Sequence, residues 1–409
     1  MVNIERIPNG YHITEAGILP TEWQVKKLNE VVTELTERAG QDMYETVSIS
    51  AGIGFVNQAE KFGKELSGKQ YEKYIVLHKG DFSYNKGNSK TSPQGCIYRL
   101  NDRESAAVPN VFESFRIKEQ DADYYEQLFL SGFLNRQLYS RINRGVRDDG
   151  LLNLTGKDFY SCMVPVPPID EQKQIAKILA QCDKVIELKQ QLIAEEEKKK
   201  RWLIENLLAD GVETEFHKCC TNTGEYGLNA PSCPFNPSLP RYIRITDIDD
   251  RGRYQRENPV SVDIQDVENY LLEEGDILFV RTGGTVGKAY RYIPQDGELV
   301  YAGFLIKFSI NQKLYDARFI YYQFFTRRYR NWVATMSARS GQPGINATEY
   351  GKYLVKIPGP IQKQSKIADV LCASDILIDR LTQELNQWNL KKAALSKLLL
   401  NGSVRIRTQ

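Results

Sequence analysis

The sequence predicts an α+β fold in which two mixed α/β domains are separated by two long helices that form a coiled coil. Three observations predict it. One stretch of the chain occurs twice at a constant offset of 192 residues, its apolar residues recur at spacings of four and three, and the segments before each copy contain short β-prone runs bounded by Gly, Asp and Asn. The length of 409 residues also exceeds one ordinary core and favours two domains.

The repeat aligns residues 168–208 with residues 360–400 without a gap. Identical pairs at the offset include Pro168/Pro360, Gln172/Gln364, Ile175/Ile367, Ala176/Ala368, Leu179/Leu371, Asp183/Asp375, Ile186/Ile378, Lys199/Lys391, Leu203/Leu395 and Leu207/Leu399. Weaker echoes link residues 77–82 to 272–277 and residues 153–155 to 346–348. We interpret the larger segments before each helix as one fold with diverged surfaces.

Each repeated stretch predicts a long helix that begins after Pro168 or Pro360 and ends near Gly211 or Gly402. A seam with four-three spacing follows Ile175, Leu179, Ile186, Ile193, Leu203 and Leu207 in the first copy and Ile367, Leu371, Ile378, Leu385, Trp388, Leu395 and Leu399 in the second, with Cys182 and Leu381 in the same register. Polar Lys189, Glu196 and Lys200 interrupt the middle of the first seam, so this helix is predicted to be a weaker zipper alone. The alternative is two amphipathic helices that each pack on their own domain.

The segments before the helices are predicted to be strand-rich domains. Strands are expected near residues 45–49, 74–77, 241–246 and 276–280, and helices near residues 122–142 and 316–336. The expected boundaries are residues 1–165 for the first domain, 166–210 for the first spacer helix, 211–356 for the second domain, 357–402 for the second spacer helix and 403–409 for a C-terminal tail.

Composition excludes several classes of protein. Lys and Arg total 54 against 52 for Asp and Glu, so no global positive field attracts nucleic acid, and such affinity must come from local patches. No apolar run approaches the ~20 residues of a membrane span, and the N-terminus lacks the basic start and apolar core of a signal peptide. Seven cysteines fit reduced thiols better than a disulfide framework. We therefore expect a soluble, cytoplasmic protein.

Motifs for catalysis, nucleotides or metals fail on spacing. The run from Gly283 to Lys288 resembles a phosphate loop, but Thr282 occupies the position of its first glycine. The neighbouring Cys219 and Cys220 would point apart, and no CxxC pair joins them in a zinc site. The Asp/Asn-Pro-Pro-aromatic motif of many amino-methyltransferases does not occur. We expect no catalytic residue, no metal and no cofactor in this chain.

Several loops combine glycine with basic and amide side chains, which donate to base edges and phosphates. The candidate DNA-binding residues are Lys86, Asn88, Ser89, Lys90, Arg144 and Arg147 in the first segment and Arg281, Thr282, Lys288, Arg339, Ser340 and Gln342 in the second. Solvated turns have much the same composition, so each residue has this second interpretation.

The order of variable domain, helix, variable domain and helix resembles the specificity subunit of type I restriction-modification enzymes. The resemblance spans nearly the whole chain and rests on the helix opening from Pro167 to Gln172 with Gln174-Ile-Ala176, on Gly17-Ile-Leu-Pro20 followed by Trp23 and Leu28, on the turns Lys79-Gly-Asp-Phe82 and Arg281-Thr-Gly-Gly284, and on residues 242–247. The second helix departs from the pattern, because it opens Pro358-Gly-Pro360 without the Asp-Glu pair, so its partner contacts are expected to be looser.

The resemblance implies two target-recognition domains in a pseudo-two-fold arrangement, separated by an antiparallel helix pair, that read the halves of a bipartite double-stranded DNA site. It also implies two modification subunits, which bind S-adenosylmethionine and methylate adenine, docked on the helices and joined by restriction subunits. The cofactor would thus lie in the partner. Two alternatives stay open at this point: a free-standing DNA methyltransferase or nuclease, and a coiled-coil scaffold without DNA contact.

Overall fold

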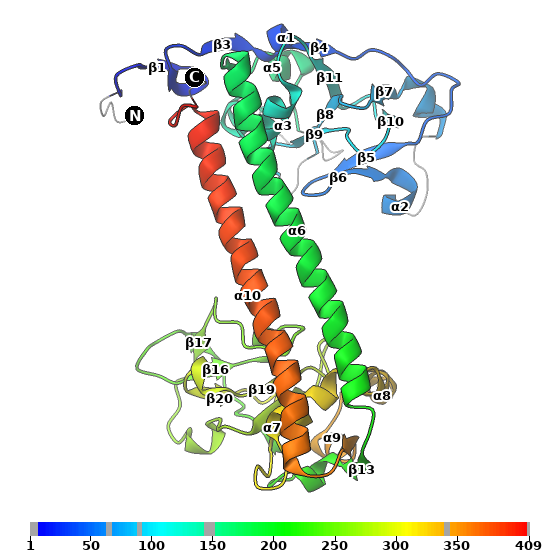
Figure 1. Ribbon diagram of the computed structural model, residues 1–409, viewed down its shortest axis with the longest axis vertical. Helices are drawn as coiled ribbons and strands as arrows, with labels where there is room; N and C mark the ends of the chain where they lie inside the picture. Colours follow the sequence, from blue (N-terminus) through cyan, green and yellow to red (C-terminus); the bar gives the residue numbers. More distant parts are fainter. Residues whose placement is uncertain (1–6, 63–67, 88–91, 143–151, 339–343, 407–409) are drawn as a thin grey trace. The chain divides into compact units, whose positions relative to one another are not determined.

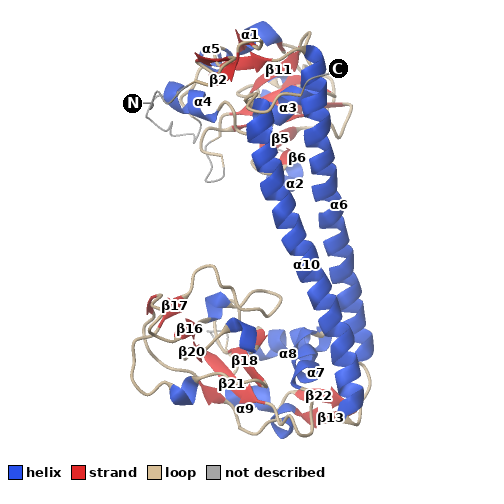
Figure 2. Cartoon of the chain, turned by 60° about the vertical axis from the view of Figure 1, so that its left-hand side comes forward, coloured by secondary structure: helices blue, strands red, loops and turns tan. Residues whose placement is uncertain are grey.

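The computed structural model describes residues 7–62, 68–87, 92–142, 152–338 and 344–406 (Figure 1). Contacts divide the chain into two compact units, one formed by residues 1–188 with 385–409 and the other by residues 189–384. Helix α6 (Ile169–Leu207) and helix α10 (Ile361–Leu400) therefore each contribute one half to either unit. Within each unit the two helices run side by side (Figure 2).

The two units contain the same four-stranded antiparallel sheet. In the first unit its order is β4 (Val32–Glu34), β11 (Glu113–Ile117), β8 (Phe82–Asn85) and β9 (Cys96–Arg99). In the second unit the order is β14 (Glu225–Tyr226), β21 (Leu305–Ser309), β18 (Asp276–Val280) and β19 (Ala289–Arg291). The matching order confirms the interpretation that both segments share one fold.

The turn that enters the central strand is repeated in detail. The Asp81 carboxylate accepts from the backbone N of His78 at 2.8 Å, and the Asp276 carboxylate accepts from the backbone N of Glu273 at 2.9 Å. The glycine before each aspartate has a φ near +100°, a conformation that glycine adopts without strain. The sequence echo between residues 77–82 and 272–277 therefore marks one turn built twice.

Smaller sheets complete each unit. In the first unit β1 (Tyr11–Thr14) pairs with β2 (Gly17–Pro20), β3 (Gln24–Lys27) with β12 (Met163–Val166), β5 (Val47–Ser50) with β6 (Gly54–Asn57), and β7 (Ile75–His78) with β10 (Ser105–Val108). In the second unit β13 (Val212–Glu215) pairs with β22 (Leu354–Ile357), and a four-stranded sheet has the order β15 (Cys233–Pro234), β17 (Val260–Ser261), β16 (Arg241–Ile243) and β20 (Leu299–Tyr301).

Both helices expected inside the domains are broken into shorter pieces. The first consists of α3 (Ala122–Leu130) and α4 (Asn135–Arg141), because Gly132 between them has a φ of +74°. The second consists of α7 (Ala317–Tyr322), a 3₁₀ turn and α8 (Arg327–Ser337), because Thr326 is extended and caps α8. The remaining α-helices of the described residues are α1 (Leu28–Val31), α2 (Gln58–Phe62), α5 (Gly156–Tyr160) and α9 (Ala347–Gly351).

The echo between residues 153–155 and 346–348 needs a correction. The hydroxyl of Thr155 caps α5 by accepting from the backbone N of Asp158, and the amide of Asn346 caps α9 by accepting from the backbone N of Glu349. Thr155 and Asn346 are thus equivalent, whereas the aligned letters had matched Asn346 with Asn153. Threonine and asparagine both cap helices well, so the two domains share the helix cap although its residue differs.

A buried glutamine fastens each long helix to the first turn of a domain helix. The side-chain oxygen of Gln172 accepts from the backbone N of Asp121, and that of Gln364 accepts from the backbone N of Asp316. Their side-chain nitrogens donate to the carbonyls of Pro167 and Gly359, five residues earlier in each copy. Because both amides are almost completely inaccessible, these bonds explain why this glutamine is identical in the two copies.

We expect Gln172→Ala and Gln364→Ala each to lower the free energy of unfolding of their unit by about 1 to 2 kcal/mol, because each removes a buried amide and leaves a half-buried backbone N–H and a carbonyl without their side-chain partner. Hydrogen exchange with mass spectrometry reports each unit separately. Gln362→Ala is the control, since Gln362 is exposed on the first turn of α10 and should change little. Equal effects of Gln364→Ala and Gln362→Ala would contradict the fastening role.

Each unit has a hydrophobic core to which both long helices contribute. The first core includes Ile175 and Leu179 of α6 with Leu399 and Leu400 of α10, packed with Trp23. The second includes Ala368 and Leu371 of α10 with Ile204 and Leu208 of α6. The helices therefore pack both on each other and on the domains, so the seam and its amphipathic alternative each describe part of the structure.

The helices are polar along most of their length. Neither α6 nor α10, nor any shorter helix in the described ranges, has an apolar stretch that could cross a bilayer. Of the cysteines, Cys162, Cys182 and Cys219 are buried, and burial raises the pKa of the Cys162 thiol to about 11 and that of Cys219 to about 12. Across the part of the chain that the structure describes, no three potential metal-ligating side chains cluster.

Candidate nucleic-acid interface

Two of the candidate DNA-binding residues occupy equivalent positions in the repeated scaffold. Lys86 follows β8, and Arg281 follows β18. The carbonyl of Lys86 accepts from the backbone N of Leu152 at 2.9 Å, and that of Arg281 accepts from the backbone N of Ile345 at 2.8 Å. The sequence placed these residues in loops, and the structure shows that the two loops leave the same strand of the same sheet.

The surroundings of the two side chains differ. The Lys86 ammonium lies 2.8 Å from the Glu113 carboxylate, and both side chains are only 15% exposed, so the lysine charge is already compensated. The Arg281 guanidinium lies instead over the ring of Tyr226, 4.8 Å from its centroid. Among the described residues no carboxylate forms an ion pair with Arg281. Equivalent positions thus present different chemistry.

Thr282 and Lys288 lie on the loop that follows Arg281. Thr282 forms a backbone bridge to Gly344. The Lys288 ammonium lies 2.7 Å from the Asp250 carboxylate and donates to the carbonyl of Ile248. Hydrogen bonding to Lys288 lowers the pKa of Asp250. Lys288 therefore ties its loop to residues 248–250, next to a cavity of about 260 Å³.

The other candidates lie outside the described residues. They are Asn88, Ser89, Lys90, Arg144, Arg147, Arg339, Ser340 and Gln342. Their assignment as DNA-binding residues stays a prediction from composition. The last described residues before the segments that carry them are Gly87, Ile142 and Ala338.

The predicted seam residues divide between buried and half-buried positions. Ile175, Leu179, Leu371, Ile378 and Leu399 are buried, and the others of the set are half-buried: Ile186, Ile193, Leu203, Leu207, Ile367, Leu385, Trp388 and Leu395. Leu203 and Leu207 pack only partly against the second core, whereas their neighbours Ile204 and Leu208 are buried in it. The predicted seam does not include Ile204 and Leu208. The face of α6 that packs on the domain is rotated from the face that continues the four-three pattern.

Ion pairs join α6 and α10 in each unit and establish that they run antiparallel. In the first unit Lys392 pairs with Asp183. In the second unit Lys189 pairs with Glu384 at 2.7 Å and Lys200 with Asp375 at 2.6 Å. The sequence predicted that Lys189 and Lys200 make α6 a weaker zipper alone, and the structure shows each of these lysines bonded to a carboxylate of α10.

The pairs Asp183–Lys392 and Asp375–Lys200 are the same interaction built twice, since both the aspartates and the lysines are 192 residues apart. The amide of Gln127 on α3 also donates to Asp183, and the hydroxyl of Tyr322 on α7 donates to Asp375 at 2.6 Å. Each aspartate therefore joins one domain helix to both long helices. The identity of this aspartate in the repeat was the sequence signal for it.

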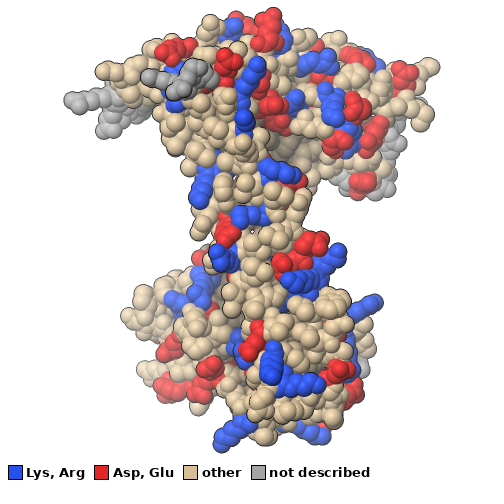
Figure 3. Space-filling view, in the orientation of Figure 1, with Lys and Arg blue, Asp and Glu red and all other residues tan. Residues whose placement is uncertain are grey.

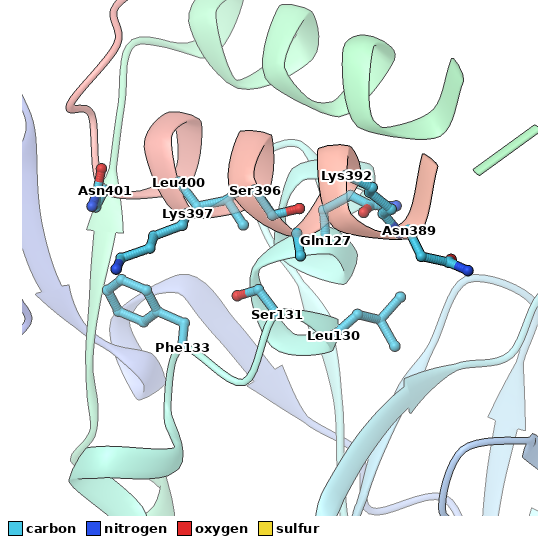
Figure 4. A pocket seen from close by; sticks show the side chains of 11 residues that line it. Gln127, Leu130, Ser131, Phe133, Asn389, Lys392, Ser396, Lys397, Leu400 and Asn401 are labelled. Carbon is cyan, nitrogen blue, oxygen red and sulfur yellow. The ribbon is translucent and has the colours of Figure 1, made fainter. Parts of the chain in front are cut away.

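A pocket of about 540 Å³ opens in the first unit between α3 and the last turns of α10 (Figure 4). Leu130, Ser131 and Phe133 line one side, and Ser396 and Lys397 line the other.

The equivalent place in the second unit is filled by the unit itself. The Lys200 ammonium lies over the rings of Tyr322 and Phe325, and Ile204 stands where α10 has Ser396. The last turns of α10 thus face a pocket in the first unit, whereas the equivalent turns of α6 pack against aromatic side chains in the second.

Comparison with known proteins identifies the family. The type I restriction modification DNA specificity domain matches residues 20–198 and 234–388, one match for each half of the repeat. The chain belongs to this family. It is 23% identical to the MjaX specificity subunit assigned to a type I restriction enzyme of Methanocaldococcus jannaschii, over 97% of this chain and 96% of that protein. It is 24% identical to the MjaVIII specificity subunit of the same organism, over 63% of this chain and 66% of that protein.

Solved structures share the fold. The S subunit of a type I restriction-modification system from M. genitalium superposes with a TM-score of 0.59 at 14% identity, covering 97% of this chain and 98% of that one. A second chain, from a study of complex assembly and conformational transition of the type I R-M system, has a TM-score of 0.56 at 16% identity over 94% and 99%. The predictions of an α+β specificity subunit, and of a recognition component rather than an enzyme, are confirmed.

Proposed function

We propose that this specificity subunit reads a bipartite double-stranded DNA site, one half with each domain. The observation that carries the proposal is the repeated scaffold, which holds Lys86 and Arg281 at one position in different surroundings. A shared frame with different side chains at its edge fits two different half-sites. A coiled-coil scaffold without DNA contact does not require different side chains at this position.

The long helices are proposed to set the separation of the two half-sites. At about 1.5 Å per residue, the 39 residues of α6 and the 40 residues of α10 are each close to 60 Å long, which exceeds the ~35 Å of one DNA turn. The cross-helix ion pairs and the shared cores favour stiff helices, as a ruler requires.

Partner subunits are proposed to supply what this chain lacks. On the face in Figure 3, Lys and Arg alternate with Asp and Glu, so attraction to phosphates should be modest without a partner. We propose that two modification subunits bring S-adenosylmethionine and adenine methylation, that restriction subunits join them, and that the complex works in the cytoplasm. The pocket beside Ser396 and Lys397 is our candidate for one modification-subunit contact, because at the equivalent place of the second unit Lys200 lies over Tyr322 and Phe325.

Methylome sequencing tests the proposal. A host that carries this chain with its modification subunit should acquire methyladenine in a two-part motif with a fixed gap. The same host with the modification subunit alone is the control and should show no such motif. Methylation at a continuous, ungapped motif, or no dependence on this chain, would contradict the proposed function.

A further inference from the structure

The loop after β18 presents an arginine that lies over one exposed aromatic ring and is hydrogen-bonded through its backbone to a second exposed aromatic residue. Tyr226 is 44% exposed, and Phe304 is 58% exposed. The Arg281 guanidinium lies over the Tyr226 ring, and its backbone N donates to the carbonyl of Phe304 at 3.0 Å. These three residues come from strands β14, β18 and β21 or their ends, so the sheet itself brings them together. We call them the Arg281 edge.

The backbone of Arg281 is held on both sides. Its N–H is bonded to Phe304 and its carbonyl to the N–H of Ile345, and the preceding carbonyl, that of Val280, accepts from the hydroxyl of Tyr350 at 2.7 Å. The Tyr226 hydroxyl in turn accepts from the backbone N of Ala347. A guanidinium that stacks on a fixed ring keeps its N–H groups directed outward, which lowers the entropy lost on binding.

The described residues leave space beside the turn after Arg281. A Cβ built at Gly283 or at Gly284 would meet none of their atoms within 4 Å. The nearest carboxylate on β14, Glu225, is already paired with Lys307 at 3.0 Å. The only formal charge that this edge offers, among the residues with described contacts, is therefore that of Arg281.

The repeat shows that this position varies between the domains. Strand register places Val111 of the first domain where the second has Phe304. Phe115 pairs with Phe82 and Phe308 pairs with Ile277, and Phe82 and Ile277 each follow the repeated Gly-Asp. Val111 and Phe304 each lie four residues before the phenylalanine of their own strand. Val111 is also exposed, at 43%. The first domain thus offers valine with a paired lysine, and the second offers phenylalanine with an unpaired arginine. Such a difference is what two half-sites of different sequence require.

We propose that Arg281 reads a guanine in the half-site of the second domain, and that Phe304 contacts the methyl group of a neighbouring thymine. Arginine donates two parallel bonds to O6 and N7 of guanine, and an aromatic side chain packs on the thymine methyl, both in the major groove. This inference rests on the proposed function and names the residues that decide the sequence of one half-site. The carbonyl of Phe304 accepts from the backbone N of Arg281, so the two side chains leave neighbouring positions of the sheet.

The first test uses the chain with its modification subunit and a pool of duplex DNA that is randomised in both half-sites. The unaltered complex should methylate a two-part motif with guanine at one position. Arg281→Ala should abolish the preference at that position and leave the other half unchanged. Arg281→Lys should weaken the preference without abolishing it, because lysine keeps the charge and donors but not the planar, paired geometry of the guanidinium. Arg380→Ala, an exposed arginine of α10, is the control and should leave the motif unaltered.

The second test replaces single atoms of the DNA. Placing 7-deazaguanine at that position should weaken binding by the unaltered complex about tenfold and should not weaken Arg281→Ala further. Uracil in place of the neighbouring thymine should weaken the unaltered complex but not Phe304→Ala. An unchanged motif for Arg281→Ala, or a uniform loss at all positions, would overturn the proposal, the latter by indicating a phosphate contact. Failure of the unaltered complex to select any two-part motif would instead overturn the proposed function.

Discussion

Removing the Arg405 side chain is expected to lower the free energy of unfolding of the first unit by about 3 kcal/mol. The guanidinium donates to both oxygens of the Glu171 carboxylate, at 2.8 and 2.9 Å, and Trp23 donates to the same carboxylate at 3.0 Å. Glu171 is only 5% exposed, so Arg405→Ala leaves a buried charge with fewer partners. Hydrogen exchange of residues 11–28 and 169–180 measures the effect.

The same contact predicts a dependence on pH. Burial alone would raise the pKa of Glu171, but hydrogen bonds from Arg405 and Trp23 outweigh it and hold the pKa below its ordinary value. A lowered pKa stabilises the folded state above the unfolded-state value of about 4.3, and this stabilisation is lost as the pH falls through the folded-state value. The difference between the unaltered chain and Arg405→Ala should therefore shrink below pH 4. A difference that grows on acidification would contradict this role.

Asp375→Ala is expected to destabilise the second unit by about 3 kcal/mol. The carboxylate accepts from Lys200 at 2.6 Å, from Arg253 at 2.9 Å and from Tyr322 at 2.6 Å, and its removal leaves a lysine that is only 14% exposed without its carboxylate. The measurement is hydrogen exchange of the second unit, with a double-mutant cycle between Asp375→Ala and Lys200→Ala to isolate the pair.

Asp183→Ala is the matched control for Asp375→Ala. Asp183 is 42% exposed, twice as much as Asp375, and it is bonded to Gln127 and Lys392 only among the described contacts. We expect a loss of about 1 kcal/mol in the first unit, because solvent screens the more exposed pair. Equal losses for the two aspartates would contradict the view that Asp375 is the stronger junction.

The two long helices could be predicted from the sequence, because an apolar periodicity over some forty residues outweighs the local preferences of single residues. The strand expected at residues 276–280 has the bounds of β18, whereas β5 begins two residues later and ends one residue later than predicted. The break at Gly132 was not predicted, since one glycine inside a helical pattern does not reveal its φ. The four-three pattern selected Leu203, but Ile204 is the buried residue. The position of the domain decides which face of α6 is buried, and the pattern does not contain that position.

The candidate interface was only partly predictable. Arg281 stands out in a Gly-rich loop, but its neighbours Tyr226 and Phe304 lie far away in the chain and meet it only through the pairing of β14, β21 and β18. An aromatic residue directly after Gly303 was the available signal. The compensation of Lys86 by Glu113 could not be predicted either, because it depends on the register between β8 and β11.

In the proposed function the paired helices fix the distance between the two half-sites. The most direct test places three additional heptads in both α6 and α10 at the boundaries of the units, after residues 188 and 384. This adds about 31 Å, close to one DNA turn. With the modification subunit bound, the preferred gap between half-sites should lengthen by about 9 base pairs while both half-sites keep their sequence. An unchanged preferred gap, or equal binding at every gap in the unaltered complex, would contradict the claim.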